Sequence, residues 1–284
     1  MTAAKTLAVV GAGTMGGQIA HQAALHGWDV HLVSRRAERL QSAHEEAAKL
    51  LRRRVEKGKL DRDAAEEALQ RVQRSTDMSM ISGNAVVIES VAEDRDAKRE
   101  VFQRIAEHVD DDAIIGTNSS TLPSSLMEDC VPIPSRLLNV HFFNPPLVMA
   151  LVEVVRGQHT SEEAVQHAME FARSIGKTPV LVAKESYGFI ANRILFIAMQ
   201  EAMKLVQEGY VSVEDCDLAV HKALGWPMGP FALADLVGLD VVESILSEGA
   251  RQTGDDRWTP LPILTEKVAQ RELGRKTGRG FTAG

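Results

Sequence analysis

The polar residues that could do chemistry fall into three groups along the chain. The first is the segment TNSSTLPSS at 117–125, which follows an apolar run. The second contains His141 and Glu153, twelve residues apart, and the third contains Asn192 in SYGFIANR. If two short strands around His141 and Glu153 pair as a hairpin, the imidazole and the carboxylate can meet. Such a pair can move a proton near neutral pH. The alternatives are a structural core histidine and an asparagine that caps a helix.

A glycine motif near the start of the chain predicts a dinucleotide site. GAGTMG fills the pattern G-x-G-x-x-G between an apolar run at 6–10 and a helix-like segment at 15–27. The first glycine permits a tight turn, the second lets the backbone approach a pyrophosphate, and the third lets the helix pack on the strand. The helix start then offers N–H groups to the phosphates. We expect cofactor contacts from Gly11, Gly13, Thr14, Met15 and Gly16.

The end of the second expected strand indicates which cofactor binds. A carboxylate there usually holds the ribose hydroxyls of NAD, but this chain has Ser34, Arg35 and Arg36. A serine hydroxyl and guanidinium groups suit a 2′-phosphate, which an acid would repel. The sequence therefore predicts a preference for NADP(H), with NAD(H) as the alternative. In the other interpretation, the two arginines only begin a helix and face solvent.

The elements that must position these residues alternate along the first two thirds of the chain. Apolar runs predict strands at 6–10, 29–33, 84–90, 112–120, 136–146, 150–155 and 178–183. Helices are expected at 15–27, 96–108 and 161–174. The segment 37–74 is rich in Ala, Glu, Arg and Leu, which predicts an inserted helical hairpin with solvated faces. This alternation is typical of a doubly wound, Rossmann-type α/β domain.

No strand pattern follows Lys184. Helices are expected at 188–209, 212–224, 230–236, 238–249 and 262–269. We therefore predict a dinucleotide-binding domain over 1–184 and an all-helical substrate and dimerisation domain over 185–284. The helix at 188–209 is apolar around much of its circumference, which is typical of a helix that packs in a bundle or against a partner. A homodimer is the expected assembly.

Composition excludes several classes of protein. The chain has 284 residues, 44% of them hydrophobic, and a net charge of −7, which argues against nucleic-acid binding. Its two cysteines form no C-x-x-C pair, and no apolar run approaches the length of a membrane span. We expect a cytoplasmic protein with no metal site and no membrane or nucleic-acid partner.

Seven segments together resemble one known family. GAGTMG, NSSTL, HFFNP, LVEVV, GFIANR, GWPMGPFALADLVGLD and GRKTGRGF occur here in the order in which 3-hydroxyacyl-CoA dehydrogenases carry them. That family includes the short-chain 3-hydroxybutyryl-CoA enzymes, and the similarity runs from about residue 6 to about residue 281. Several ordered motifs are far more specific than any one of them.

The resemblance implies roles at the matching positions. His141 is similar to the family's catalytic histidine, and Glu153 to the glutamate paired with it. Ser120 and Asn192 resemble the residues that hydrogen-bond the reacting oxygen or the histidine, and both are expected to contact the substrate. The cofactor set is completed by Asn118, Glu93 and Lys98, of which the last two resemble residues that line the nicotinamide side.

The predicted function is hydride transfer between a nicotinamide cofactor and C3 of a short-chain 3-hydroxyacyl or 3-ketoacyl thioester such as 3-hydroxybutyryl-CoA. Arg54 and Lys57, with the adjoining Arg52 and Arg53, could bind CoA phosphates. Ala150 replaces a lysine that the family commonly has, which puts the acyl carrier in question. The alternatives are a dehydrogenase of a free 3-hydroxy acid or a carrier-protein-bound acyl group, and a nucleotide-sensing or structural protein without catalysis.

Overall fold

The computed structural model describes residues 5–282, so the outermost ends of both predicted domains lie outside the described residues. The chain divides into two compact units, the first ending at Phe189 and the second beginning at Ile190. The sequence placed the domain boundary at 184/185, a few residues earlier. Within the described part of the chain, no helix has the length and apolar character needed to cross a membrane.

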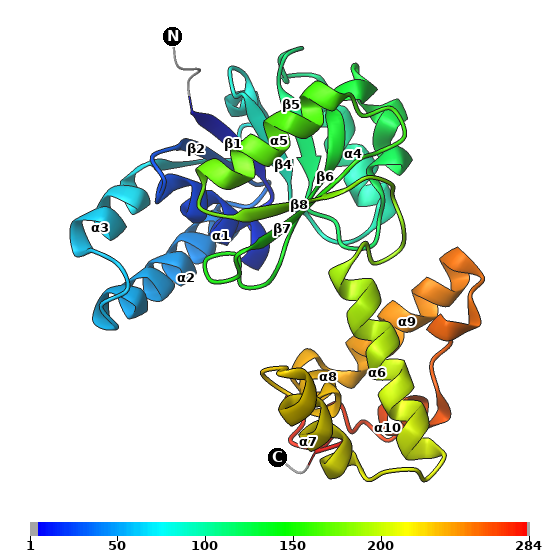
Figure 1. Cartoon of the computed structure of the whole chain (residues 1–284). Helices are drawn as coiled ribbons and strands as arrows, with labels where there is room; N and C mark the ends of the chain where they lie inside the picture. The colour runs from blue at the N-terminus through cyan, green and yellow to red at the C-terminus, as the bar shows by residue number, and fades with distance from the viewer. Residues whose placement is uncertain (1–4, 283–284) are drawn as a thin grey trace. The chain divides into compact units, whose positions relative to one another are not determined.

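The first unit is built on an eight-stranded sheet (Figure 1) with the order β3-β2-β1-β4-β5-β6-β7-β8. The first six strands in this order run parallel, β7 is antiparallel to β6, and β8 is parallel to β7. Their bounds are β1 Thr6–Val10, β2 Asp29–Val33, β3 Val72–Ser75, β4 Val86–Glu89, β5 Ile114–Thr117, β6 Leu137–Phe142, β7 Leu151–Val155 and β8 Thr178–Val182.

Both faces of this sheet are covered, as its continuous apolar strands require. Successive strand residues point to opposite faces, so Val9 packs in one core and Val10 in the other. On one side lie α1 Thr14–Ala24, α2 Ala37–Glu56, α3 Arg62–Gln70 and α5 Glu162–Ser174. On the other lie α4 Arg95–Ala106 and the 3-10 turns η1 Met78–Ile81 and η2 Ser124–Cys130; a further turn, η3 Pro134–Arg136, precedes β6. The doubly wound fold is confirmed.

The predicted hairpin over 37–74 differs from the structure at its end. Helices α2 and α3 form as expected, but residues from Val72 form the edge strand β3, which pairs with β2. Only Val72 of this strand is buried, and the exposed Gln73 and Arg74 follow it. A short strand at a sheet edge needs few apolar residues, so its composition resembled that of the charged helices before it.

The second unit is all helical, as predicted. It contains α6 Ala191–Gln207, α7 Val213–Leu224, α8 Pro230–Val237, α9 Leu239–Thr253, the 3-10 turn η4 Asp256–Trp258 and α10 Pro262–Ala269. The carboxylate of Asp217 on α7 accepts the backbone N–H groups of Phe231 and Ala232 at the start of α8. The buried Asp235 on α8 accepts hydrogen bonds from the backbone N–H groups of Phe281 and Thr282 and so anchors these two residues.

Candidate active site

The strands β6 and β7 bring His141 and Glu153 together. The two residues are directly opposite each other in the antiparallel register, so their side chains share one face of the sheet. His141 Nδ1 donates a hydrogen bond to Glu153 Oε2 over 2.9 Å, and the two residues are 2% and 1% exposed. Because Glu153 holds the proton-bearing Nδ1, the other ring nitrogen, Nε2, acts as the acceptor.

Ser120 completes a chain of three polar groups. It follows β5, the strand beside β6, and its hydroxyl oxygen lies 3.0 Å from His141 Nε2. Two aromatic rings pack beside the imidazole: the centroid of Phe143 is 4.6 Å from that of His141, and the centroid of Phe189 is 5.5 Å away. The imidazole is therefore held on one side by a carboxylate and on its flanks by apolar rings, with a hydroxyl at Nε2.

The turn that contains Ser120 is held by Glu93. One oxygen of Glu93 accepts the backbone N–H groups of Ser120 and Thr121, each at 3.0 Å, and the hydroxyl groups of Ser119 and Thr121. Burial raises the pKa of Glu93, but the charge of Lys98 and the hydrogen bonds from Ser119 and Thr121 outweigh this effect and hold it below its usual range. Glu93 is therefore ionised at neutral pH.

The glycine motif forms a cradle between β1 and α1. Gly11 has a φ of +118°, and an added Cβ would lie 2.3 Å from the carbonyl oxygen of Ser90. A Cβ on Gly16 would lie 1.9 Å from the carbonyl oxygen of Gly11, whereas one on Gly13 would meet nothing within 4 Å. No side chain caps the start of α1 at Gly13, and its first turn has no acidic residue. This combination fits a pyrophosphate, which needs open backbone and the positive end of a helix.

The end of β2 lies beside this cradle, because β1 and β2 are neighbours. Ser34 is half-buried there, and its backbone N–H donates to the carbonyl of Ser75 on β3. The side chains of Arg35 and Arg36 are exposed, immediately before α2 begins. This placement suits a ribose or its 2′-phosphate at the carboxyl edge of the sheet, and it leaves the choice of cofactor a prediction.

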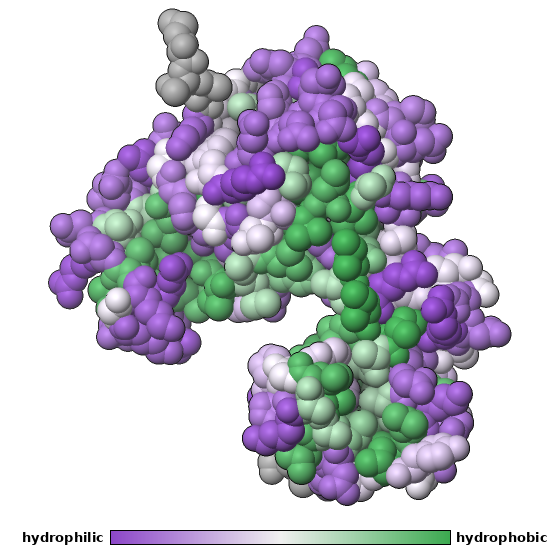
Figure 2. All heavy atoms as spheres, viewed as in Figure 1, coloured by the Kyte–Doolittle hydropathy of each residue, from purple (hydrophilic) through white to green (hydrophobic). Residues whose placement is uncertain are grey.

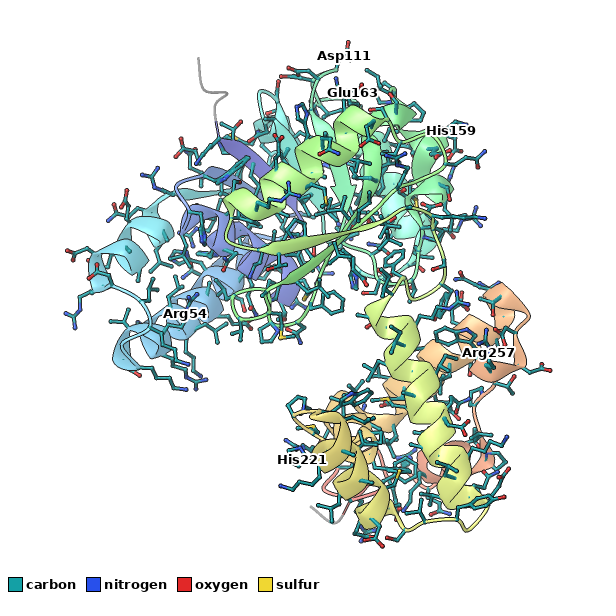
Figure 3. All side chains as sticks on the ribbon, in the orientation of Figure 1. Arg54, Asp111, His159, Glu163, His221 and Arg257 are labelled. Atoms are coloured by element: carbon teal, nitrogen blue, oxygen red, sulfur yellow. The ribbon has the colours of Figure 1, made fainter. Side chains whose placement is uncertain are left out.

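The other predicted residues have different positions. Asn118 is buried beside the cradle: its side chain donates to Ser90 Oγ and accepts the backbone N–H of Phe142. Arg54 lies on α2 (Figure 3), where its guanidinium donates to the carbonyl of Leu147, and Lys57 is exposed just after that helix. Asn192 is in the first turn of α6, in the second unit, and its role stays a prediction from the resemblance.

One buried residue was missing from the predicted site. Glu89 ends β4 and is fully buried, and both of its carboxylate oxygens accept from Lys98 Nζ, at 2.8 and 2.9 Å. The signal was present in the segment NAVVIES, where an acid stands in an otherwise apolar strand. A buried carboxylate needs a partner, and Lys98, nine residues later, was available.

Comparison with known proteins decides the family. The model of the 3-hydroxyacyl-CoA dehydrogenase NAD-binding domain matches residues 6–186, and that of the 3-hydroxyacyl-CoA dehydrogenase C-terminal domain matches residues 188–284. The chain belongs to the 3-hydroxyacyl-CoA dehydrogenase family. The first unit of this dehydrogenase is therefore a domain that binds a nicotinamide cofactor.

Individual relatives agree with this assignment over their full length. The dehydrogenase is 38% identical to a 3-hydroxybutyryl-CoA dehydrogenase of Clostridioides difficile, with 97% of this chain and 98% of the relative covered. It is 37% identical to a probable 3-hydroxybutyryl-CoA dehydrogenase of Deinococcus radiodurans, covering 96% and 98%. Among solved structures, the (S)-3-hydroxybutyryl-CoA dehydrogenase of Ralstonia eutropha has a TM-score of 0.94 at 34% identity, covering 98% of both chains.

Proposed function

We propose that this dehydrogenase interconverts short-chain 3-hydroxyacyl-CoA and 3-ketoacyl-CoA thioesters, with NADP(H) as the preferred cofactor. The observation that carries the proposal is the arrangement of Glu153, His141 and Ser120 at the same sheet edge as the glycine cradle. The names of full-length relatives support a four-carbon substrate. A nucleotide sensor, the non-catalytic alternative, would not need a buried proton-transfer pair.

The residues act on the proton of the alcohol. The nicotinamide, when bound, accepts the hydride from C3. His141 Nε2 accepts the hydroxyl proton as the hydride leaves, and Glu153 stabilises the resulting imidazolium through Nδ1. In the reverse direction His141 returns this proton to the forming alkoxide. The hydroxyl of Ser120, at hydrogen-bond distance from Nε2, is placed to donate to the same oxygen.

Two features support the preference for NADP(H). Ser34 carries no charge that would repel a 2′-phosphate, and the exposed Arg35 and Arg36 follow it directly. A guanidinium can bind phosphate through two parallel N–H groups. NAD(H) is the alternative cofactor, and it is favoured if the arginines only face solvent.

The next question is which group carries the acyl chain of the substrate. Lys57 and the neighbouring arginines of α2 could bind phosphates of CoA, but Arg54 already donates to Leu147 of the β6–β7 connection. Ala150 adds no charge at the end of this connection. We therefore keep free 3-hydroxy acids and carrier-protein-bound acyl groups as the second candidate substrates.

We also propose that the second unit forms a homodimer interface and contributes to substrate binding. Apolar surface is visible over its helices in Figure 2. The exposed apolar side chains of this unit include Ile194, Leu218, Leu224, Leu236, Val237 and Val241. Large apolar side chains exposed in this number favour a protein interface on this unit.

One assay tests the function. Purified protein is supplied with NADPH or NADH and with 3-ketobutyryl-CoA, longer 3-ketoacyl-CoA thioesters, an N-acetylcysteamine thioester and free acetoacetate. We expect the highest kcat/KM with 3-ketobutyryl-CoA and NADPH. A higher kcat/KM with acetoacetate would support the free-acid alternative, and absence of turnover with every substrate would contradict the catalytic proposal.

A further inference from the structure

A group of three charges, of which two are buried, lies at the end of β4 and the start of α4. Glu89 and Lys98 are 0% and 1% exposed, and Lys98 Nζ contacts both oxygens of Glu89. Two further donors reach the same carboxylate: the hydroxyl of Thr117 on β5 and the backbone N–H of Val91, each at 2.6 Å. Three donor groups that make four hydrogen bonds are the surroundings that a buried carboxylate requires.

Glu93 is the third charge. One of its oxygens is 3.4 Å from Lys98 Nζ, and the other accepts from the turn that carries Ser120. Two carboxylates therefore share one ammonium group, and the cluster Glu89–Lys98–Glu93 has one net negative charge. The charge is held in place, because Glu89 and Lys98 are buried and the Glu93 carboxylate has four hydrogen bonds to residues 119–121.

The cluster lies between the glycine cradle and the proton-transfer residues. Ser90, the residue after Glu89, touches the cradle, since its carbonyl oxygen is the atom that a Cβ on Gly11 would meet. At the other end, Glu93 holds the N–H of Ser120, whose hydroxyl contacts His141. A cofactor whose pyrophosphate binds the cradle must extend across the carboxyl ends of β4 and β5 to bring its nicotinamide to His141.

We propose that Glu89 is a positioning residue that gives this cluster its net negative charge and thereby lowers the ratio Kd(oxidised)/Kd(reduced) relative to that of a neutral cluster. The nicotinamide ring is a cation when oxidised and is neutral once it has accepted a hydride. A fixed negative charge near the ring stabilises only the cationic form. Without Glu89, the ammonium group of Lys98 would cancel the charge of Glu93. The inference rests on the proposed function in placing the nicotinamide between the cradle and His141.

The test compares binding of oxidised and reduced cofactor to the full-length protein. The dissociation constants of NADP⁺, NADPH, NAD⁺ and NADH are measured by isothermal titration calorimetry for the wild type and three variants. Glu89→Gln and Glu93→Gln each remove the net charge of the cluster, and the double variant Glu89→Gln/Lys98→Met leaves Glu93 as its one charge and so restores one negative charge. Because both members of each cofactor pair share every other contact, the ratio Kd(oxidised)/Kd(reduced) isolates the effect of charge.

We expect Glu89→Gln to raise this ratio on the order of tenfold. This is the effect of removing one charge within about 10 Å of the cationic ring at an effective dielectric constant of about 20. Glu93→Gln should raise the ratio in the same way, and the double variant should return it toward the wild-type value. If Glu89→Gln weakens both forms equally, or the double variant keeps the raised ratio, Glu89 has only a structural role. If Glu89→Gln does not fold, an unchanged ratio in Glu93→Gln, which removes the same net charge, overturns the proposal. Failure of all four cofactors to bind the wild type would contradict the proposed function as well, whereas binding with unchanged ratios contradicts this inference alone.

Discussion

At the residue scale, the pairing of His141 with Glu153 depends on the register between β6 and β7. His141 faces Glu153 because Asn139 pairs with Val155 and Phe142 with Val152 along the same ladder. A shift by one residue would turn one of the two side chains to the other face of the sheet. The pair is buried, so its geometry is set by the packing of the strands and not by solvent.

We expect His141→Gln to fold and bind cofactor but to lose about 10²–10⁴-fold in kcat, because it removes the group that donates the proton to the forming alkoxide during reduction. Glu153→Gln should also lower kcat, since an amide no longer fixes the imidazole tautomer or stabilises the imidazolium. The measurement is kcat with 3-ketobutyryl-CoA, with cofactor binding as the control for folding. Near-wild-type kcat in either variant would show that the pair is structural.

The end of β2 provides a second prediction. Ser34→Asp together with Arg35→Ala should reverse the cofactor preference, because the new carboxylate accepts from the ribose hydroxyls and repels a 2′-phosphate. A hydrogen bond to a charged group contributes about 1.5–3 kcal/mol, or roughly 10–150-fold in affinity. The checks are kcat/KM for NADPH and NADH in both proteins at fixed salt. A wild type that uses NADH better than NADPH would show that the arginines only face solvent.

At the element scale, the connection between β6 and β7 is anchored by a buried lysine. Lys177, just before β8, donates from Nζ to the carbonyls of Pro146 and Met149, at 2.5 and 2.8 Å. Burial, together with the smaller effect of the charge of Arg54, lowers the pKa of Lys177 from 10.5 to about 8. The connection that joins the strands of His141 and Glu153 is therefore held by a group that titrates in a measurable range.

This titration makes stability depend on pH. Between about pH 8 and 10.5 the unfolded chain holds the Lys177 proton more tightly than the folded chain, so the free energy of unfolding should rise with pH. The slope from this one group is at most about 1.4 kcal/mol per pH unit. Lys177→Met should flatten the curve measured by denaturant unfolding over this range, and the exposed Lys184→Met should not. Parallel curves for wild type and Lys177→Met would show that the carbonyls keep the ammonium protonated.

The sequence predicted the elements whose pattern is long and periodic, and it missed contacts made across elements. The apolar runs gave the strands, and the twelve-residue spacing of His141 and Glu153 was compatible with the hairpin that the structure contains. The strand β3 was missed because an edge strand buries little. The ion pair of Glu89 with Lys98 joins β4 to α4. A local sequence pattern does not predict which of several nearby charged residues will pair with a buried acid.

At the scale of the whole molecule, the two units differ in how far their apolar side chains are covered. The sheet of the first unit is covered on both faces by its own helices. The second unit leaves large apolar side chains exposed on several helices, including Leu218 at 54% and Leu224 at 66%. Such exposure is costly in water unless another surface covers it.

We therefore expect light scattering at micromolar concentration to give twice the 31.0 kDa mass of the chain. Leu218→Glu/Leu224→Glu should weaken this dimer by at least about 100-fold in dissociation constant, because burying each leucine contributes about 1.5–3 kcal/mol and a buried carboxylate opposes association. Val148→Glu is the matched control: it places the same charge on an apolar side chain that is 65% exposed in the first unit, and it should leave the mass unchanged. A monomeric wild type would contradict the dimer, and a dimer disrupted by Val148→Glu but not by the double variant would assign the interface to the first unit.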